Sequence, residues 1–244
     1  MSSICTNFAV MLTKGRGIVL NSLKYGDDAS IVAVYFKNEG VVSFLCRAAK
    51  GRQGRGVRML MQPLSVVEVE FDLRQNRQLQ YMKEVRAAVM LDEVYRNPYK
   101  ITIVMFVAEV LRYVLKGEKG NAELFRFIVE SLVWLEHSGE DFASFHIVFL
   151  AKLLCFLGYN PMYDEEFREI VASKVGRDAM SGPRLDMNDI ANLIGMEYEK
   201  MNLYAMNHSE RNQCLEVLIS YYKLRIPGFP ELKSLEILRE VYGN

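Results

Sequence analysis

The 244-residue sequence has few cysteines and histidines, and their spacing does not suit the common metal centres. The four cysteines, Cys5, Cys46, Cys155 and Cys214, are widely scattered, whereas zinc ribbons take ligands two to four residues apart. A disulfide framework is not expected in a chain this long, so we predict free, buried thiols. The three histidines have no acidic residues at a metal-binding spacing. The sequence therefore predicts a protein without a metal or other cofactor.

Long apolar runs are also missing. The longest, Ile101–Ala108 and Ile147–Leu157, fall short of the roughly 20 residues that a transmembrane helix requires, and we predict that both are buried helices. Residues 1–14 lack the basic and apolar regions of a signal peptide. The sequence thus predicts a cytoplasmic protein that does not act at a membrane.

The signatures of several enzyme classes are absent. There is no Walker phosphate loop, and Gly51, Gly54 and Gly56 do not have the order of a dinucleotide fingerprint. The motifs H-E-x-x-H and G-x-S-x-G do not occur either. The acidic clusters Asp27–Asp28 and Asp164–Glu166 are predicted to be solvated turn or helix-cap residues. We therefore expect a protein that is not an enzyme.

Charge is balanced over the whole chain but unevenly distributed along it. Residues 1–90 contain 13 lysines and arginines against 7 aspartates and glutamates, a net charge of +6. The remainder contains 17 against 23, a net charge of −6. Such asymmetry indicates a part that binds nucleic acid joined to a part with another role.

The first ninety residues have the pattern of short strands separated by turns. In Leu64–Leu73, for example, apolar Val67, Val69 and Phe71 alternate with acidic residues, which is the period of a half-buried strand. Five strands are predicted, over Gly17–Leu23, Ala29–Lys37, Val41–Cys46, Leu64–Leu73 and Leu79–Val89. Five short strands in this length are typical of an OB-fold barrel, which we place at residues 1–90.

After Pro98 the apolar residues recur at helical spacing. Predicted helices cover Ile101–Lys116, Ala122–Glu136, Phe142–Leu157, Met187–Ile194, Ser209–Leu224 and Leu232–Tyr242. Short loops between them indicate packed antiparallel helices. The predicted fold class is therefore α+β, with an N-terminal OB-fold barrel followed by an all-helical domain over residues 91–244.

The segment Arg47–Arg58 is the most distinctive in the sequence. It has five basic residues, three glycines and no acidic residue, and we predict a mobile loop between two strands. Cations on a flexible backbone can follow a phosphate chain and release its counterions. The alternative is an ordinary solvated loop. The predicted DNA-binding residues are those of this loop and of neighbouring turns: Lys14, Arg16, Arg47, Lys50, Arg52, Arg55, Arg58, Arg74 and Arg77.

Barrel aromatics can stack on bases in proteins that bind single strands. Tyr25, Tyr35, Phe36 and Phe44 are the candidates. Core packing is the better interpretation for Phe36 and Phe44. Tyr25, in a polar turn, is the best stacking candidate.

These segments, in this order, resemble the RecO family of bacterial recombinational repair proteins. Residues 162–187 contain no cysteine, whereas many members carry a four-cysteine zinc element there. The end of the chain resembles the version found in Bacteroides-like bacteria. The similar segments are Thr13–Leu20, Tyr25–Asp27, Ile31–Phe36, Arg47–Arg58, Gln62–Leu64, Leu157–Pro161, Tyr221–Leu224 and Pro227–Phe229.

The resemblance implies an OB-fold and a helical domain in a protein that binds single- and double-stranded DNA and anneals complementary strands. It also implies contact with the acidic C-terminal tail of single-stranded-DNA-binding protein, and work with RecR to help load RecA. A tail of this kind requires a cation beside an apolar slot. Arg112 and Lys116 are predicted to share one helix face, and Lys152 interrupts an apolar helix, so these three are the candidate tail-binding residues.

Three other functions remain open from the sequence. An RNA-binding OB-fold protein would prefer RNA in competition with DNA. A metal-dependent nuclease would cleave DNA when magnesium is present. A scaffold would not bind nucleic acid at all.

Overall fold

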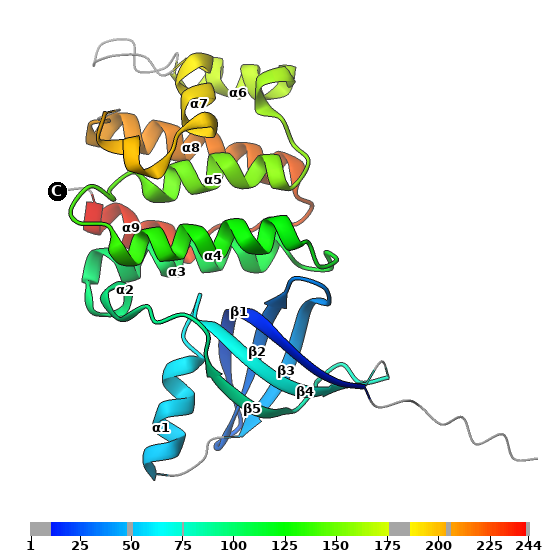
Figure 1. Cartoon of the computed structure of the whole chain (residues 1–244). Helices are drawn as coiled ribbons and strands as arrows, with labels where there is room; N and C mark the ends of the chain where they lie inside the picture. The colour runs from blue at the N-terminus through cyan, green and yellow to red at the C-terminus, as the bar shows by residue number, and fades with distance from the viewer. Residues whose placement is uncertain (1–10, 48–50, 75, 176–185, 204–205, 243–244) are drawn as a thin grey trace, which may run out of the picture. The chain divides into compact units, whose positions relative to one another are not determined.

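The structure is a computed structural model that describes residues 11–47, 51–74, 76–175, 186–203 and 206–242 (Figure 1). The chain divides into two compact units. The first contains residues 1–90 together with 115–125, and the second contains residues 91–114 and 126–244.

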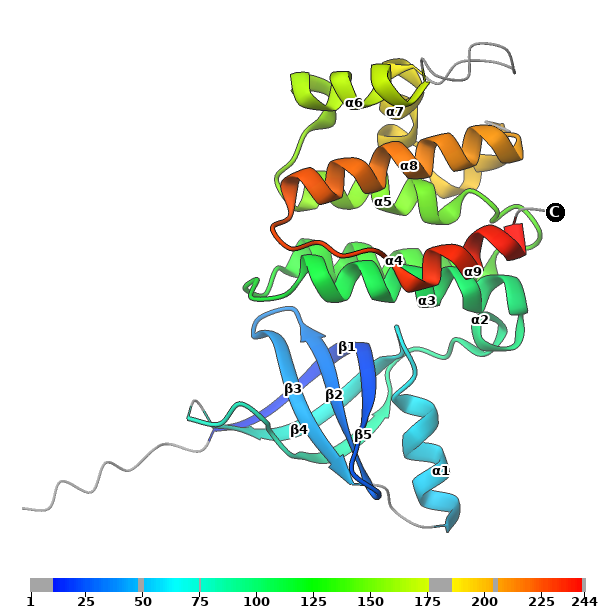
Figure 2. The ribbon, with the colours of Figure 1, turned by 180° about the vertical axis from the view of Figure 1, so that it is seen from behind.

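The first unit is built on a five-stranded antiparallel sheet. The strands are β1 (Met11–Tyr25), β2 (Ala29–Phe36), β3 (Gly40–Arg47), β4 (Val66–Leu73) and β5 (Met82–Ala87), in the spatial order β3-β2-β1-β4-β5. The sheet closes where Gln80 pairs with β3, because its N–H donates to Ser43 O at 2.8 Å and its carbonyl accepts from Leu45 N at 2.9 Å. Figure 2 shows this barrel from behind. The predicted OB-fold is confirmed.

Alternate residues of the strands fill the barrel, as period two requires. Phe44 lies 6.1 Å from Phe36 and 5.0 Å from Phe71, measured between ring centroids, and all three are buried. The predicted core role of Phe36 and Phe44 is therefore confirmed. Gly17 faces the same interior, where an added Cβ would lie 2.4 Å from Val34 Cγ1. Strand β1 begins at Met11, six residues before its predicted start, because residues 11–18 pair with β4.

The predicted mobile loop after β3 is wrong over most of its length, because residues Gly51–Leu60 form the helix α1. Val57 and Leu60 pack against the barrel core, and Met61 is buried in it. These apolar residues recur three and four apart, so one side of the helix has a core to cover. Tertiary packing therefore outweighs the weak helix propensity of three glycines.

Residues 115–125 pack against the barrel in the first unit. The Tyr35 hydroxyl accepts a hydrogen bond from Asn121 N at 3.1 Å. Gly40, at φ +73°, lies so close that an added Cβ would be 2.5 Å from Glu118 O. Tyr35 is fully buried, so it is not available to stack on a base.

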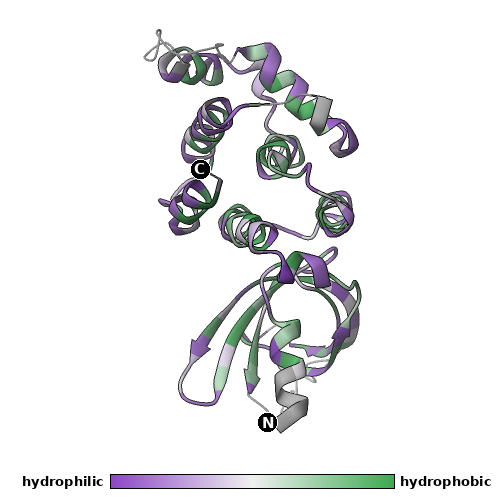
Figure 3. Cartoon of the chain, turned by 90° about the vertical axis from the view of Figure 1, so that its left-hand side faces the viewer, coloured by the Kyte–Doolittle hydropathy of each residue, from purple (hydrophilic) through white to green (hydrophobic). Residues whose placement is uncertain are grey.

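The second unit is helical, and its apolar sides face one another in Figure 3. Among the described helices, none is long and apolar enough to cross a membrane. All six predicted helices are present, whereas the helices Asp92–Arg96 and Glu165–Val175 and two 3₁₀ helices had no clear pattern in the sequence. The elements are α2 (Asp92–Arg96), α3 (Pro98–Val114), α4 (Ala122–His137), α5 (Phe145–Phe156), η1 (Pro161–Tyr163), α6 (Glu165–Val175), α7 (Met187–Gly195), η2 (Tyr198–Leu203), α8 (His208–Arg225) and α9 (Lys233–Tyr242).

Polar side chains connect the ends of these helices. Lys100 is only 1% exposed, and its Nζ donates to the carbonyl oxygen of Ser138 at 2.7 Å, just beyond α4. Glu136 in turn accepts from the backbone N–H groups of Glu93 and Val94, both at 2.9 Å. The unpaired groups at the C-terminus of α4 and the N-terminus of α2 are thereby satisfied.

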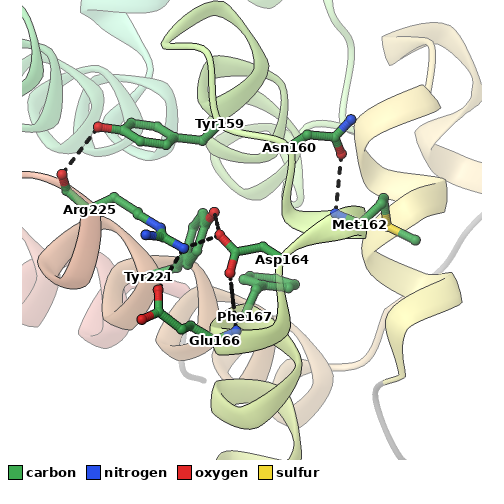
Figure 4. Close-up of polar contacts among 8 residues, drawn as sticks. All are labelled: Tyr159, Asn160, Met162, Asp164, Glu166, Phe167, Tyr221 and Arg225. Carbon is green, nitrogen blue, oxygen red and sulfur yellow. Dashed lines mark hydrogen bonds and ion pairs between the residues drawn. The ribbon is translucent and has the colours of Figure 1, made fainter.

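A second polar cluster joins α6 to α8 (Figure 4). Asp164 accepts from Glu166 N at 3.1 Å, which confirms its predicted role as a helix cap. It also accepts from the Tyr221 hydroxyl at 2.5 Å and forms an ion pair with Arg225. Arg225 pairs with Glu166 at 2.7 Å as well. The Tyr221 hydrogen bond, and next the Arg225 bond, hold the pKa of Asp164 below its usual value.

Candidate nucleic-acid interface

On one face of the barrel, a row of acidic side chains is paired with lysine and arginine side chains. Strand β4 has three acidic residues that alternate with its core residues, and their partners lie on β1 and β5. Each acid forms one ion pair: Lys14–Glu70 at 2.8 Å, Lys83–Asp72 at 2.6 Å, and Arg86–Glu68. A phosphate contact at any of these cations would compete with a carboxylate already in place. Lys14 is therefore a weaker candidate than its position in the sequence suggested.

Arg16 lies on the same side of β1 as Lys14 and is directly opposite Glu68. It is exposed, and within the described part of the chain it forms no ion pair. Its neighbour Glu68 is already held by Arg86. Of Lys14 and Arg16, only Arg16 is therefore without a carboxylate partner among the described ion pairs.

The far ends of β1, β2 and β3 form a different surface. Ala29 is paired with Tyr25 on one side and with Arg47 on the other, so all three lie on one face of the sheet. Strands lie about 4.8 Å apart, which places an aromatic ring and a guanidinium roughly 10 Å apart across a small alanine. Tyr25 is 58% exposed, and Arg47 is exposed as well. These three neighbouring positions could accept a stacked base at Tyr25 and a phosphate at Arg47.

Acidic residues limit where a phosphate chain can run from Arg47. Asp27 and Asp28 are exposed in the β1–β2 turn next to Tyr25, and they repel phosphate. Lys24, also exposed, precedes them and offsets part of this charge. A phosphate chain bound at Arg47 would therefore have to run away from this turn.

Helix α1 supplies the remaining cations of this surface. Arg52, Arg55 and Arg58 occur at intervals of three, a spacing that places positions along one side of a helix. Arg58 is exposed. Lys50 lies outside the described residues. We use the name cationic surface for the sequence positions Arg47, Lys50, Arg52, Arg55 and Arg58, of which the structure describes the side chains of Arg47 and Arg58.

Arg74 and Arg77 belong to the β4–β5 connection. Arg77 is exposed and Arg74 is half-buried. Figures 1 and 2 show this connection on the opposite side of the barrel from α1. The structure therefore does not join these two arginines to the cationic surface, and they form a separate candidate contact.

The three candidate tail-binding residues lie on different elements of the chain. The helix α3 ends at Val114 and residues 115–117 form a turn, so the predicted common helix face of Arg112 and Lys116 is wrong. The Arg112 guanidinium packs over the Tyr113 ring at 4.9 Å. Lys152 is half-buried on α5, where burial lowers its pKa while the charges of nearby acidic residues raise it.

Two residues of the candidate interface were missed by the sequence analysis. Lys24 has no distinctive motif in the sequence, although its charge lies at the same end of the strands as Arg47. Gln80 had no signal at all, because a glutamine in a polar stretch resembles any surface residue. It is 4% exposed, and its side chain contacts the β4–β5 connection.

The described residues contain no cluster of three or more histidine, cysteine, aspartate or glutamate side chains that could hold a metal ion. Cys214 is buried, Cys46 is half-buried and Cys155 is exposed, all as free thiols. The predicted burial is therefore wrong for Cys155, and Cys5 lies outside the described residues. The absence of zinc stays a prediction.

Known proteins are similar to this chain over nearly its full length. The family models for the N-terminal and C-terminal parts of recombination protein O match residues 11–90 and 96–178. DNA repair protein RecO of Phocaeicola vulgatus is 36% identical over 242 residues, covering 96% of this chain and all of the relative. That of Bacteroides fragilis is 35% identical over 241 residues, covering 95% of this chain and all of the relative. The chain therefore belongs to the RecO family of DNA repair proteins.

Proposed function

We propose that this protein is a mediator that binds single- and double-stranded DNA and anneals complementary strands without any covalent chemistry. Membership of the RecO family supports a role in recombinational DNA repair. The single observation that carries the proposal is the contrast between the two barrel surfaces. One has its cations paired with β4 carboxylates, while the other presents Arg47 and Arg58 exposed.

The cationic surface binds DNA through its backbone phosphates. Each neutralised phosphate releases counterions, which makes the binding sequence-independent and sensitive to salt. Annealing follows from the same chemistry, because neutralising two strands lets them approach and base pairing then supplies the free energy. No step requires a nucleophile, a general acid or a metal ion.

Tyr25 gives the surface a preference for single strands. A base in a duplex is already stacked, whereas an unpaired base gains free energy by stacking on an exposed ring. The neighbouring Arg47 holds the phosphate of the same strand. Single-stranded DNA therefore uses both residues, and a duplex uses only the arginine.

We also propose that the helical part, within residues 91–244, carries the protein contacts. These are the acidic C-terminal tail of single-stranded-DNA-binding protein, and RecR during the loading of RecA, in the cytoplasm. Lys152 is the best of the candidate tail-binding cations, because it is half-buried and the half-buried Phe156 lies four residues after it on α5. Arg112 and Lys116 remain as separate candidates.

A strand-annealing assay on DNA coated with the cognate single-stranded-DNA-binding protein tests this proposal. We expect annealing with and without the coat, and loss of the coated reaction alone when the protein coat lacks its tail. Competition by RNA over DNA, or DNA cleavage with magnesium, would instead favour an RNA-binding protein or a nuclease. Failure to bind any nucleic acid would favour a scaffold.

A further inference from the structure

The β4–β5 connection is held by one buried side chain. Gln80 Nε2 donates to the carbonyl oxygens of Arg74, at 3.0 Å, and Arg77, at 2.8 Å. Its Oε1 accepts from the Arg74 backbone N–H at 3.1 Å. Because the two carbonyls can only accept, the orientation of the amide is fixed by its partners. Both donor hydrogens of the amide and one lone pair are thereby used within the connection.

The backbone of Gln80 anchors the same residue to the far side of the sheet. Its N–H and carbonyl form the two hydrogen bonds to Ser43 and Leu45 that close the barrel. The side chain that holds the connection thus extends from a point fixed on β3. A further hydrogen bond, from Arg77 N to Arg74 O at 3.1 Å, joins the backbones of the two arginines directly.

The composition of this turn suits a phosphate chain. Residues 74–80 contain two arginines and no acidic residue. Tyr81, next to Gln80, is 49% exposed and adds an aromatic surface of the kind on which bases stack. Gln80 is buried and cannot contact DNA itself. Any effect of Gln80 on DNA binding must therefore act through Arg74 and Arg77, whose backbone it holds.

We infer that Gln80 is a positioning residue for DNA binding, which holds the backbone of Arg74 and Arg77 in the arrangement that contacts phosphates. The inference rests on the proposed DNA-binding function. Backbone groups that are already held at Arg74 and Arg77 lose less conformational freedom when these arginines bind a ligand. Without the amide, the same two arginines remain present and charged. They must then be ordered when DNA binds, and the entropy that this costs weakens the complex.

A double-mutant cycle tests the inference. Gln80→Met removes the amide while keeping the charge and approximate length of the side chain. It is measured in the natural chain and in the Arg74→Ala, Arg77→Ala background, by fluorescence anisotropy with a single-stranded oligonucleotide. We expect Gln80→Met to weaken binding about five- to tenfold in the natural chain, the range given by ordering one or two long side chains. In the background without the arginines we expect less than a twofold effect.

The control is Val42→Ala, which removes buried volume from β3 in the same barrel without touching the connection. At a temperature where all variants are folded by circular dichroism, Val42→Ala should leave DNA affinity unchanged. An effect of Gln80→Met that is equal in both backgrounds would overturn the positioning role. If the double arginine variant binds as tightly as the natural chain, the connection does not contact DNA and the inference is wrong, while binding at the cationic surface stands. If the natural chain binds no DNA, the proposed function itself fails.

Discussion

Lys14 on β1 and Glu70 on β4 face each other across the barrel sheet, with Nζ and Oε1 2.8 Å apart. The hydrogen bond to Glu70, together with its charge, raises the pKa of Lys14. The pair shows that counting lysines and arginines does not locate a phosphate-binding surface. A cation is free to bind phosphate only when no carboxylate is already paired with it. In this barrel the acidic residues of β4 pair with Lys14, Lys83 and Arg86, whereas Arg47 and Arg58 are exposed.

Tyr25 should distinguish single strands from duplexes. Tyr25→Ala removes an exposed ring that can stack on an unpaired base, so binding to a single-stranded oligonucleotide should weaken by about 1–3 kcal/mol. Binding to a duplex should change little. Tyr163→Ala is the matched control, since Tyr163 is 85% exposed on the helical part. Equal losses for single- and double-stranded DNA would show that Tyr25 does not stack on bases.

Two glycines of the first unit should respond in opposite ways to the same substitution. Gly56 lies in α1, and an added Cβ would meet nothing within 4 Å. Gly56→Ala should therefore stabilise the protein by about 0.5–1 kcal/mol, since alanine favours the helix. Gly17→Ala should destabilise it, because the new methyl would lie 2.4 Å from Val34 Cγ1. Urea unfolding measures both, and a destabilised Gly56→Ala variant would contradict the helical account of α1.

The sequence predicted those elements whose pattern repeats. The strands with period two and the long helices such as α3 and α8 can be predicted from the spacing of their apolar residues, which is visible within a short stretch of sequence. The sequence did not predict helix α1, because three glycines lower the helix propensity of this segment. The spacing of Val57 and Leu60 indicates a helix only once both residues are known to pack on the barrel. The Lys14–Glu70 pair could not be predicted either, because it depends on the register between strands far apart in the sequence.

His146 should make the protein less stable in mild acid. It is 3% exposed, and burial and then the charge of Arg211 lower its pKa to about 3. An unfolded histidine has a pKa near 6.5, so the unfolded chain binds a proton that the folded chain excludes. This contribution to the free energy of unfolding is complete above about pH 6.5 and is lost as the pH falls toward 3. In this range the free energy of unfolding should fall by up to about 1.4 kcal/mol per pH unit.

Unfolding by urea between pH 7.5 and pH 5 measures this slope against His146→Phe. Phenylalanine preserves a ring near Phe106 and Tyr242, with which His146 makes ring contacts. The stability of the variant should depend less on pH than that of the natural chain. Identical slopes over this range would rule out His146 as the cause.

The hydroxyl of Tyr221 should contribute to the stability of the helical part. Tyr221→Phe removes its hydrogen bond to the Asp164 carboxylate, and bonds to charged groups are worth about 1.5–3 kcal/mol. Tyr159→Phe is the control, because that hydroxyl donates to the neutral carbonyl of Arg225 at 3.2 Å. Its loss should be near 1 kcal/mol. Thermal and urea unfolding compare the two, and a larger effect at Tyr159 would contradict the account.

The salt dependence of DNA affinity tests the cationic surface most directly. Replacing Lys50, Arg52, Arg55 and Arg58 with alanine should reduce the slope of log affinity against log salt by roughly 0.7 for each phosphate contact, about 3 in all. Replacing Lys14, Lys83 and Arg86 removes cations that are already paired with carboxylates, and should reduce the slope by less than about 1. Anisotropy titrations of single-stranded DNA at several salt concentrations give both slopes. An unchanged slope in the quadruple variant, or an equal fall in both variants, would contradict DNA binding at this surface.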